Sequence, residues 1–284
     1  MTKVSSLAGR RVARMNGAGN KILVLDLRDG APAPTLEEAR AIDRAAGLDY
    51  DQLMTLTPPR AAGTLSLVRI YNNDGSLAGA CGNGTRCVAD RLARETGLAA
   101  LEVETERGVI ACERLGPWTY RVDMGPPRLG WAEIPFAREV DTRAVDIPGA
   151  EAFGAAGLVN MGNPHAVFFV SDPAAVDLQR IGPTLENHPL FPDKANVSFA
   201  QVLAPDRLRL RVWERGVGAT LACGSAACAA LVAAARRGLA KREATIELPG
   251  GELVIAWRDD GPVLMTGPVE FEREIELTPA IFAA

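Results

Sequence analysis

Two stretches of the chain, one in each half, show the apolar pattern of β-strands. LSLVRIYN at 65–72 and RLRLRVWE at 207–214 alternate apolar and polar residues or run β-branched and apolar, which is typical of strands. A glycine-rich turn follows each strand, and a stretch rich in alanine and leucine with helical character comes next. Each helical stretch closes at a glycine, Gly97 or Gly238, a residue favoured just beyond a helix end. The pattern predicts a strand, a turn and one long helix in each half.

Hairpin-like strands follow the predicted helix in both halves, LEVETERGVIACER at 101–114 and ATIELPGGELVIAWR at 244–258. An alanine-rich helix can be buried inside a curled sheet because its small side chains let the strands approach closely. The sequence therefore predicts an α+β fold of two pseudo-symmetric, mostly-β, barrel-like domains. Each domain is expected to surround a central helix, and the two are expected to face each other across a cleft.

The chain also contains an internal repeat with a nearly constant offset. ACGNGTRCVADRLA around Cys81 matches ACGSAACAALVAA around Cys223, 142 residues later. Further pairs at offsets of 141 to 144 residues are Gly19-Asn20 with Gly162-Asn163, Gln52 with Asn196, Asn72 with Glu214, Gly97 with Gly238 and Gly125 with Gly267. The offset predicts two copies of one fold, residues 1–127 and 128–270. The segment 271–284 has no counterpart in the first copy and is a candidate to complete the sheet of the first domain.

Composition and charge exclude several classes of protein. Of the 284 residues, 48% are hydrophobic and the net charge is only -4, with no basic run or aromatic stacking pattern, so nucleic acid is not an expected partner. The first residues lack the apolar core of a secretion signal, and the most apolar stretch, 222–235, is too short to span a membrane. We expect a soluble, cytoplasmic protein with no membrane partner.

The five cysteines, an odd number without an export signal, indicate reduced thiols; they are Cys81, Cys87, Cys112, Cys223 and Cys228. Their spacings and the two histidines do not match a zinc site, so no metal is expected. Cys87, Cys112 and Cys228 are expected to pack in the core. His188, beside Pro189, is expected to be structural.

Cys81 and Cys223 differ from the other cysteines because each stands directly before a glycine and a predicted helix start. A helix N-terminus offers unpaired N–H groups and a positive dipole end. We expect this setting to lower the thiol pKa and to hold a substrate carboxylate. If both helix ends reach one substrate, the α-carbon lies between two sulfurs about 7 Å apart. The residues thus predict an α-proton transfer by two bases that needs no cofactor.

Six motifs, in order along the chain, resemble those of the diaminopimelate epimerase family: MNGAGN, YDQLMTL, NNDGSLAGACGNGTRC, VNMGNPH, NVSF and WERGVGATLACGSAAC. The resemblance covers nearly the whole chain. It implies a cofactor-independent isomerase, commonly a homodimer. Such enzymes interconvert LL- and meso-diaminopimelate in lysine and peptidoglycan-precursor synthesis.

The resemblance also implies roles for individual residues. Cys81 and Cys223 are implied as the paired acid and base, and His165, with Glu214, as a group that tunes the reacting end or a nearby thiol. The implied backbone donors for the reacting carboxylate are Gly82, Asn83, Gly224 and Ser225. The residues implied to hold the rest of the substrate are Asn20, Gln52, Asn72, Asn163, Asn196, Glu214 and Arg215. Arg215 offers a fork for the distal carboxylate, and Glu214 an acceptor for an ammonium group.

Some positions depart from the family pattern, and other functions stay open. Asn16 stands where histidine is frequent, Lys21-Ile22 where Asp-Phe is frequent, Ala219 where an acidic residue is frequent and Ser225 where threonine is frequent. A proline or hydroxyproline racemase has the same cysteine pair, but its substrate lacks a second amino-acid head. A phenazine-type isomerase lacks the thiol pair, and a thiol redox protein needs a C-x-x-C motif. A non-catalytic amino-acid binding module is the alternative of another class.

Overall fold

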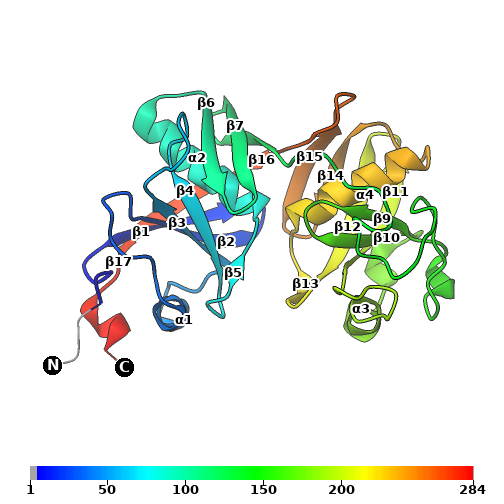
Figure 1. Cartoon of the computed structure of the whole chain (residues 1–284), viewed down its shortest axis with the longest axis horizontal. Helices are drawn as coiled ribbons and strands as arrows, with labels where there is room; N and C mark the ends of the chain where they lie inside the picture. The colour runs from blue at the N-terminus through cyan, green and yellow to red at the C-terminus, as the bar shows by residue number, and fades with distance from the viewer. Residues whose placement is uncertain (1–4, 284) are drawn as a thin grey trace. The chain divides into compact units, whose positions relative to one another are not determined.

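The computed structural model describes residues 5–283, which form two compact units (Figure 1). Unit 1 combines the described residues of Met1–Val122 and of Gly267–Ala284, and unit 2 is Asp123–Thr266. Residues 1–4 and 284, which the first repeat and the terminal segment were expected to include, lie outside the described residues. The repeat boundaries at 127 and 270 stay a prediction from the sequence.

Unit 1 is a curled mixed sheet with two helices. Its strands run in the order β17-β1-β2-β3-β4-β6-β7-β8, with the short β5 paired to β4. The β2–β3 and β4–β6 pairs are parallel and the others antiparallel. The elements are β1 (Arg11–Gly17), β2 (Asn20–Asp26), α1 (Leu36–Arg44), β3 (Gln52–Thr57), β4 (Leu67–Asn72), β5 (Leu77–Ala78), α2 (Gly82–Thr96), β6 (Ala100–Thr105), β7 (Gly108–Gly116), β8 (Thr119–Asp123), β17 (Glu270–Glu276) and the 3-10 turn η3 (Pro279–Phe282).

Unit 2 repeats this topology. Its strands run β9-β10-β11-β12-β14-β15-β16, with the short β13 paired to β12. The β10–β11 and β12–β14 pairs are parallel. The elements are η1 (Glu151–Phe153), β9 (Gly157–Asn160), β10 (Pro164–Phe169), η2 (Pro173–Ala175), α3 (Leu178–Glu186), β11 (Asn196–Ala204), β12 (Arg207–Glu214), β13 (Gly218–Thr220), α4 (Gly224–Arg236), β14 (Glu243–Leu248), β15 (Gly251–Trp257) and β16 (Val263–Pro268).

The matching order of strands and helices confirms the predicted fold class of two pseudo-symmetric, mostly-β units. In each unit, the parallel pairs occupy the same places and the long helix follows the same short strand. The long helix is α2 in unit 1 and α4 in unit 2. The strand predicted at 65–72 begins two residues later, at Leu67. Leu65 and Ser66 form backbone hydrogen bonds with Glu102 and Glu104 of β6 before the regular strand begins.

The long helices form the centres of their units, and in α4 small side chains make this possible. Every residue of α4 from Ala226 to Ala234 is buried, and this helix packs against six strands of unit 2. Gly157 of β9 shows how close the approach is: a Cβ there would lie 2.9 Å from the Cβ of Ala233. Larger side chains at these positions would force the strands apart.

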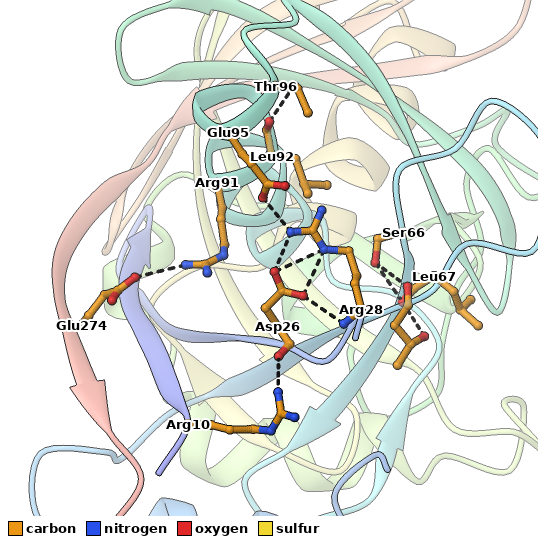
Figure 2. A network of polar contacts seen from close by, with 11 residues as sticks. Arg10, Asp26, Arg28, Ser66, Leu67, Arg91, Leu92, Glu95, Thr96 and Glu274 are labelled. Atoms are coloured by element: carbon orange, nitrogen blue, oxygen red, sulfur yellow. Dashed lines mark hydrogen bonds and ion pairs between the residues drawn. The ribbon is translucent and has the colours of Figure 1, made fainter. Parts of the chain in front are cut away.

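Ion pairs fasten α2 to the sheet of unit 1 (Figure 2). Arg28, just after β2, pairs with Asp26 at 2.5 Å and with Glu95 of α2 at 2.6 Å. Arg91 of α2 pairs with Glu274 of β17 at 3.4 Å. The carboxyl-terminal half of α2 is therefore held from two strands. Cys81 lies at the opposite end of the same helix.

The terminal segment of the chain is part of unit 1. Strand β17 pairs antiparallel with β1, from Arg11 opposite Glu276 to Asn16 opposite Glu270. Leu277, directly after β17, is fully buried in the core that surrounds α1. The segment thus gives β1 a second neighbour in addition to β2.

Candidate active site

Cys81 caps the amino end of α2. Its backbone is extended (φ −149°, ψ 99°), and its Sγ accepts the Gly84 N–H at 3.3 Å. A side chain at Gly84 has no room, because its Cβ would lie 2.5 Å from the sulfur of Met54. The first N–H groups of a helix have no acceptor within it, so those of Gly82 and Asn83 can serve an anion. The sulfur and these donors therefore share one helix end.

Cys223 occupies the equivalent position at the amino end of α4. Its backbone is also extended (φ −135°, ψ 111°), and its Sγ lies 3.4 Å from the hydroxyl of Ser225. Gly224 and Ser225 provide the first N–H groups of the helix. The described residues thus give each unit one sulfur beside one helix-end anion site.

The thiol of Cys223 has an environment that the sequence did not indicate. It is buried, with 6% of the residue exposed. Burial raises its pKa well above the ordinary value, and the charge of Glu214 raises it further; the Ser225 hydroxyl and the Ala226 N–H act in the opposite direction. The expected lowering of the pKa is therefore wrong for Cys223. Its resting form is the neutral thiol.

A pH titration of Cys223 should show the effect of Glu214. We expect iodoacetamide to alkylate Cys223 with a pH midpoint above 9.0, the ordinary thiol pKa, and Glu214→Gln to lower that midpoint because the variant removes a repelling charge. Tandem mass spectrometry of peptides alkylated at a series of pH values measures both midpoints. Cys112, whose pKa burial alone raises to about 12, is the internal control. An unchanged Cys223 midpoint in the variant would contradict the influence of Glu214.

The remaining cysteines pack inside the units. Cys87 in α2 and Cys228 in α4 are fully buried, and Cys112 in β7 is buried as well. Burial raises the pKa of Cys87, so its thiol stays protonated. All five cysteines carry thiols rather than disulfides in the part of the chain that the structure describes.

Two pairs of amide side chains lie at or near the amino end of α2 in unit 1. Gln52 of β3 places its Oε1 3.4 Å from Cys81 Sγ, and Asn72 of β4 is its cross-strand partner. Asn83 donates a side-chain hydrogen bond to Asn20 of β2. Both of these asparagines are buried. Unit 1 thus brings together every residue that the sequence assigned to its half of the site.

The departures from the family pattern in unit 1 have local partners. Asn16 accepts the Gly19 N–H through its side chain at 2.8 Å, which closes the turn before Asn20. Lys21 pairs with Asp49 at 2.5 Å, and its backbone N–H donates to Asp51 at 2.8 Å. The added charge of Lys21 is therefore matched by a carboxylate on its own unit.

In unit 2, a histidine and two asparagines lie together at the ends of β10 and β11. His165 is fully buried and its Nε2 lies 2.9 Å from Asn163 Oδ1. Asn196, beside His165 in the parallel pair, donates to the Pro164 carbonyl at 2.9 Å and accepts the Arg215 N–H at 3.0 Å. These bonds fix the orientation of the amide groups.

The two charged residues of unit 2 that the sequence assigned to the substrate, Glu214 and Arg215, lie where β12 ends. Glu214 accepts a hydrogen bond from the Thr220 hydroxyl, and the Arg215 guanidinium donates to the Asp193 carbonyl at 2.8 Å. Ala219, a departure from the family pattern, is an exposed residue of β13 opposite Trp213. His188 accepts the Leu190 N–H at 3.2 Å and belongs to the loop after α3.

Sequence reasoning missed two buried charged residues near the site. Arg86 of α2 is fully buried and donates to Asn83 Oδ1 at 3.0 Å. Glu186 of α3 is buried and accepts from Trp213 and Gly216. The only local signal for Arg86 is a charged residue within an otherwise buried helix, three positions after Asn83. Nothing local to Glu186 marks it.

Two further features bear on membrane and metal binding. No helix of residues 5–283 combines the length and apolar character needed to cross a membrane. Within the same residues, no three or more histidine, cysteine or acidic side chains gather as a metal site would require.

Comparison with known sequences gives a consistent result. The sequence model of the family described as diaminopimelate epimerase matches residues 12–130 and 157–272. A diaminopimelate epimerase of Methylocella silvestris is 54% identical over 290 residues, covering 99% of both chains. One of Nitrobacter hamburgensis is 51% identical over 288 residues, again covering 99% of both chains.

Solved structures with low sequence identity show the same fold. A phenazine biosynthesis protein of the PhzF family from Enterococcus faecalis is 15% identical with a TM-score of 0.68, covering 94% of this chain and 98% of its own. A probable proline racemase from Agrobacterium radiobacter is 15% identical with a TM-score of 0.65, covering 95% and 93%. At this identity, the likeness concerns the fold alone.

Proposed function

The chain belongs to the diaminopimelate epimerase family, and we propose that it interconverts LL- and meso-diaminopimelate by proton transfer between Cys81, the substrate α-carbon and Cys223. The observation that carries this proposal is the equivalent placement of the two cysteines, each as the capping residue of a central helix. Relatives named as this epimerase match over nearly the full chain. The chain is accordingly an isomerase with a small-molecule substrate.

The helix ends supply the binding site for the reacting carboxylate. The proposed donors are the backbone N–H groups of Gly82, Asn83, Gly224 and Ser225. A helix N-terminus binds anions because these N–H groups lack helical acceptors and the dipole is positive there. The same donors stabilise the negative charge that spreads onto the carboxylate when the α-proton leaves. The mechanism requires that both helix ends reach one substrate.

The proton transfer uses one thiolate and one thiol. The thiolate takes the α-proton, the electrons of the C–H bond move onto the α-carbon and its carboxylate, and the opposite thiol gives its proton to the other face. The configuration inverts and the two sulfurs exchange protonation states. The raised pKa of Cys223 favours the thiol there before reaction. The Gly84 N–H donates to the Cys81 sulfur, a contact that stabilises a thiolate once Cys81 has lost its proton.

The second amino-acid head of the substrate explains the polar side chains beyond the cysteines. We assign Arg215 to the distal carboxylate, because a guanidinium binds a carboxylate through two parallel hydrogen bonds. Glu214 is the acceptor for an ammonium group, and Asn20, Gln52, Asn72, Asn163 and Asn196 complete the set. His165, bonded to Asn163, orients that amide. Proline lacks a second head and would leave Arg215 without a partner.

Incubation with LL-diaminopimelate tests the function. We expect the reduced protein to form the meso isomer, measured by chiral chromatography, and to leave L-proline and L-hydroxyproline unchanged. Inversion of proline but not of diaminopimelate would favour a racemase. Binding of diaminopimelate without inversion, with all thiols shown to be reduced, would identify an amino-acid binding module.

The family resemblance also supports the cellular setting that we propose. The enzyme would act in the cytoplasm, in lysine and peptidoglycan-precursor synthesis, as a homodimer and without a cofactor. The helix-end donors support a reaction without a cofactor, because they stabilise the negative charge of the carbanion that a cofactor would otherwise have to accept. Light scattering measures the assembly state, and activity after exhaustive dialysis against a chelator tests the requirement for a metal.

A further inference from the structure

Two of the proposed substrate-binding residues lie where β12 meets the following turn: Glu214 is the last residue of the strand, and Arg215 is the first residue of the turn. Hydrogen bonds hold three successive N–H groups of this turn. The Arg215 N–H donates to Asn196 Oδ1 at 3.0 Å, the Gly216 N–H to Glu186 Oε1 at 2.9 Å and the Val217 N–H to the Glu214 carbonyl at 3.1 Å. Gly216 has a left-handed backbone (φ +76°), a conformation that favours glycine. The turn therefore has one well-defined conformation.

Glu186 forms hydrogen bonds with the two residues that flank Glu214 and Arg215 in the sequence, Trp213 and Gly216. While its Oε1 binds the Gly216 N–H, its Oε2 accepts the indole N–H of Trp213 at 2.7 Å. The residue is only 6% exposed. A buried carboxylate is costly without donors, and hydrogen bonds to a charged acceptor are stronger than neutral ones. The carboxylate therefore fixes the residues before and after Glu214 and Arg215.

The packing of α3 supports this arrangement. Gly182, one turn before Glu186, lies so close to Trp213 that a Cβ would come within 2.3 Å of indole Cδ2. Only glycine lets the helix approach the ring in this way. The indole is thus fixed by α3 both through its face and through its N–H group.

The equivalent helix of unit 1 braces the equivalent turn. In α1, Arg40 donates to the Asp74 carbonyl at 2.5 Å, and a Cβ at Gly75 would come within 2.7 Å of the Leu36 carbonyl oxygen. Tyr50 also donates to the Asn72 carbonyl at 3.4 Å. Both repeats therefore place a short helix against the turn that carries a proposed substrate residue.

We propose that Glu186 is a positioning residue, whose carboxylate holds the β12–β13 turn so that Glu214 and Arg215 meet the substrate. This inference rests on the proposed function of those two residues. A carboxylate suits the task because it accepts through both oxygens, as the two N–H groups require. Glutamine has one oxygen and one NH₂ group, so it can satisfy only one of the two donors.

The variant Glu186→Gln tests the proposal. We expect KM for diaminopimelate to rise about tenfold or more, the effect of losing one hydrogen bond to a charged group, with a smaller change in kcat. We also expect the alkylation midpoint of Cys223 to fall, because Glu214 moves away from the thiol. Glu151→Gln is the matched control, since Glu151 accepts the Gly149 N–H at 2.9 Å but holds none of the proposed substrate groups. This control variant should leave both KM and the alkylation midpoint of Cys223 unchanged.

The outcomes separate this inference from the proposed function. An unchanged KM together with an unchanged Cys223 midpoint in Glu186→Gln would overturn it, even if the melting temperature fell. If the unaltered protein does not epimerise diaminopimelate, the proposed function fails, and the Cys223 midpoint alone decides whether Glu186 places Glu214. If Glu186→Gln does not fold, Trp213→Phe removes one of the two donors. It should raise KM a few fold and lower the midpoint, and unchanged values would overturn the inference.

Discussion

Replacing either Cys81 or Cys223 by alanine is expected to lower kcat for epimerisation by at least about 10³-fold, within the range for loss of a general acid or base. Inversion needs both a proton acceptor and a proton donor, on opposite faces of the α-carbon. Each of the two helices has one cysteine as its capping residue, so neither cysteine can replace the other. Steady-state formation of meso-diaminopimelate from the LL isomer measures the loss.

Cys112→Ala is the matched control for removing one thiol. Cys112 lies in β7 and is buried, and its sulfur contacts the Ile110 carbonyl at 3.9 Å. Its loss should reduce thermal stability through a small cavity but leave kcat unchanged. Circular dichroism and melting curves establish that the Cys81 and Cys223 variants keep their fold. Substantial activity in either single variant would contradict the two-base scheme.

Arg215→Gln is expected to raise KM for diaminopimelate by about 10²-fold, the loss expected for a bidentate charged hydrogen bond. The effect should depend on the distal head of the substrate. Exchange of the α-proton of 2-aminopimelate, which has a distal carboxylate but no distal ammonium group, should be weakened in the variant by a similar factor. Exchange of 2-aminoheptanoate, which has no distal charge, should be equally slow in the variant and the unaltered protein.

Arg211→Gln is the control for Arg215. Arg211, in the strand β12 that precedes Arg215, also donates to backbone carbonyls, those of Pro173, Ala174 and Val176. Its replacement should reduce stability while KM stays unchanged. If Arg215→Gln alters the three substrates alike, or none of them, its assignment to the distal carboxylate is wrong.

The internal repeat in the sequence predicted most of the fold and most of the candidate site. A constant offset between equivalent residues identifies equivalent positions in two copies of one topology, and Cys81 and Cys223 do cap equivalent helices. Gln52 and Asn196 likewise begin equivalent strands, β3 and β11. Such agreement arises because the glycine-rich turns and the helix starts depend on residues close together in the sequence.

The short helices were not predicted, although one left a clear local signal. Thr35 and Glu38 form a capping box at the start of α1, a pattern readable from the sequence as T-x-x-E. For α3, Asp177 caps the helix, but Gly182 and Pro183 interrupt the expected helical pattern. Gly182 is needed there because Trp213, 31 residues later in the sequence, occupies the space of a side chain.

The protonation of Cys223 could not be predicted because it depends on burial. A helix N-terminus lowers a thiol pKa, and this local effect is what the sequence displays. Desolvation by the surrounding unit and the charge of Glu214 act in the opposite direction and are larger. Cys223 and Glu214 are nine residues apart, and the pairing of β12 with β13, which sets Glu214 opposite Gly218, folds the intervening chain back on itself. The contacts of Glu186 are hidden from the sequence for the same reason.

The central claim is that two thiols act on opposite faces of one carbon, and isotope incorporation at low conversion tests it most directly. LL-diaminopimelate is incubated in heavy water, and substrate and product are separated and analysed by mass spectrometry. A two-base mechanism predicts one deuterium at the inverted carbon of the meso product, because the acidic thiol carries a deuteron from the solvent. It predicts no deuterium in the recovered LL substrate, because a carbanion that reverts takes back the proton that the thiolate had removed. Meso product that retains the original proton, or LL substrate that gains deuterium as fast as product forms, would contradict the account.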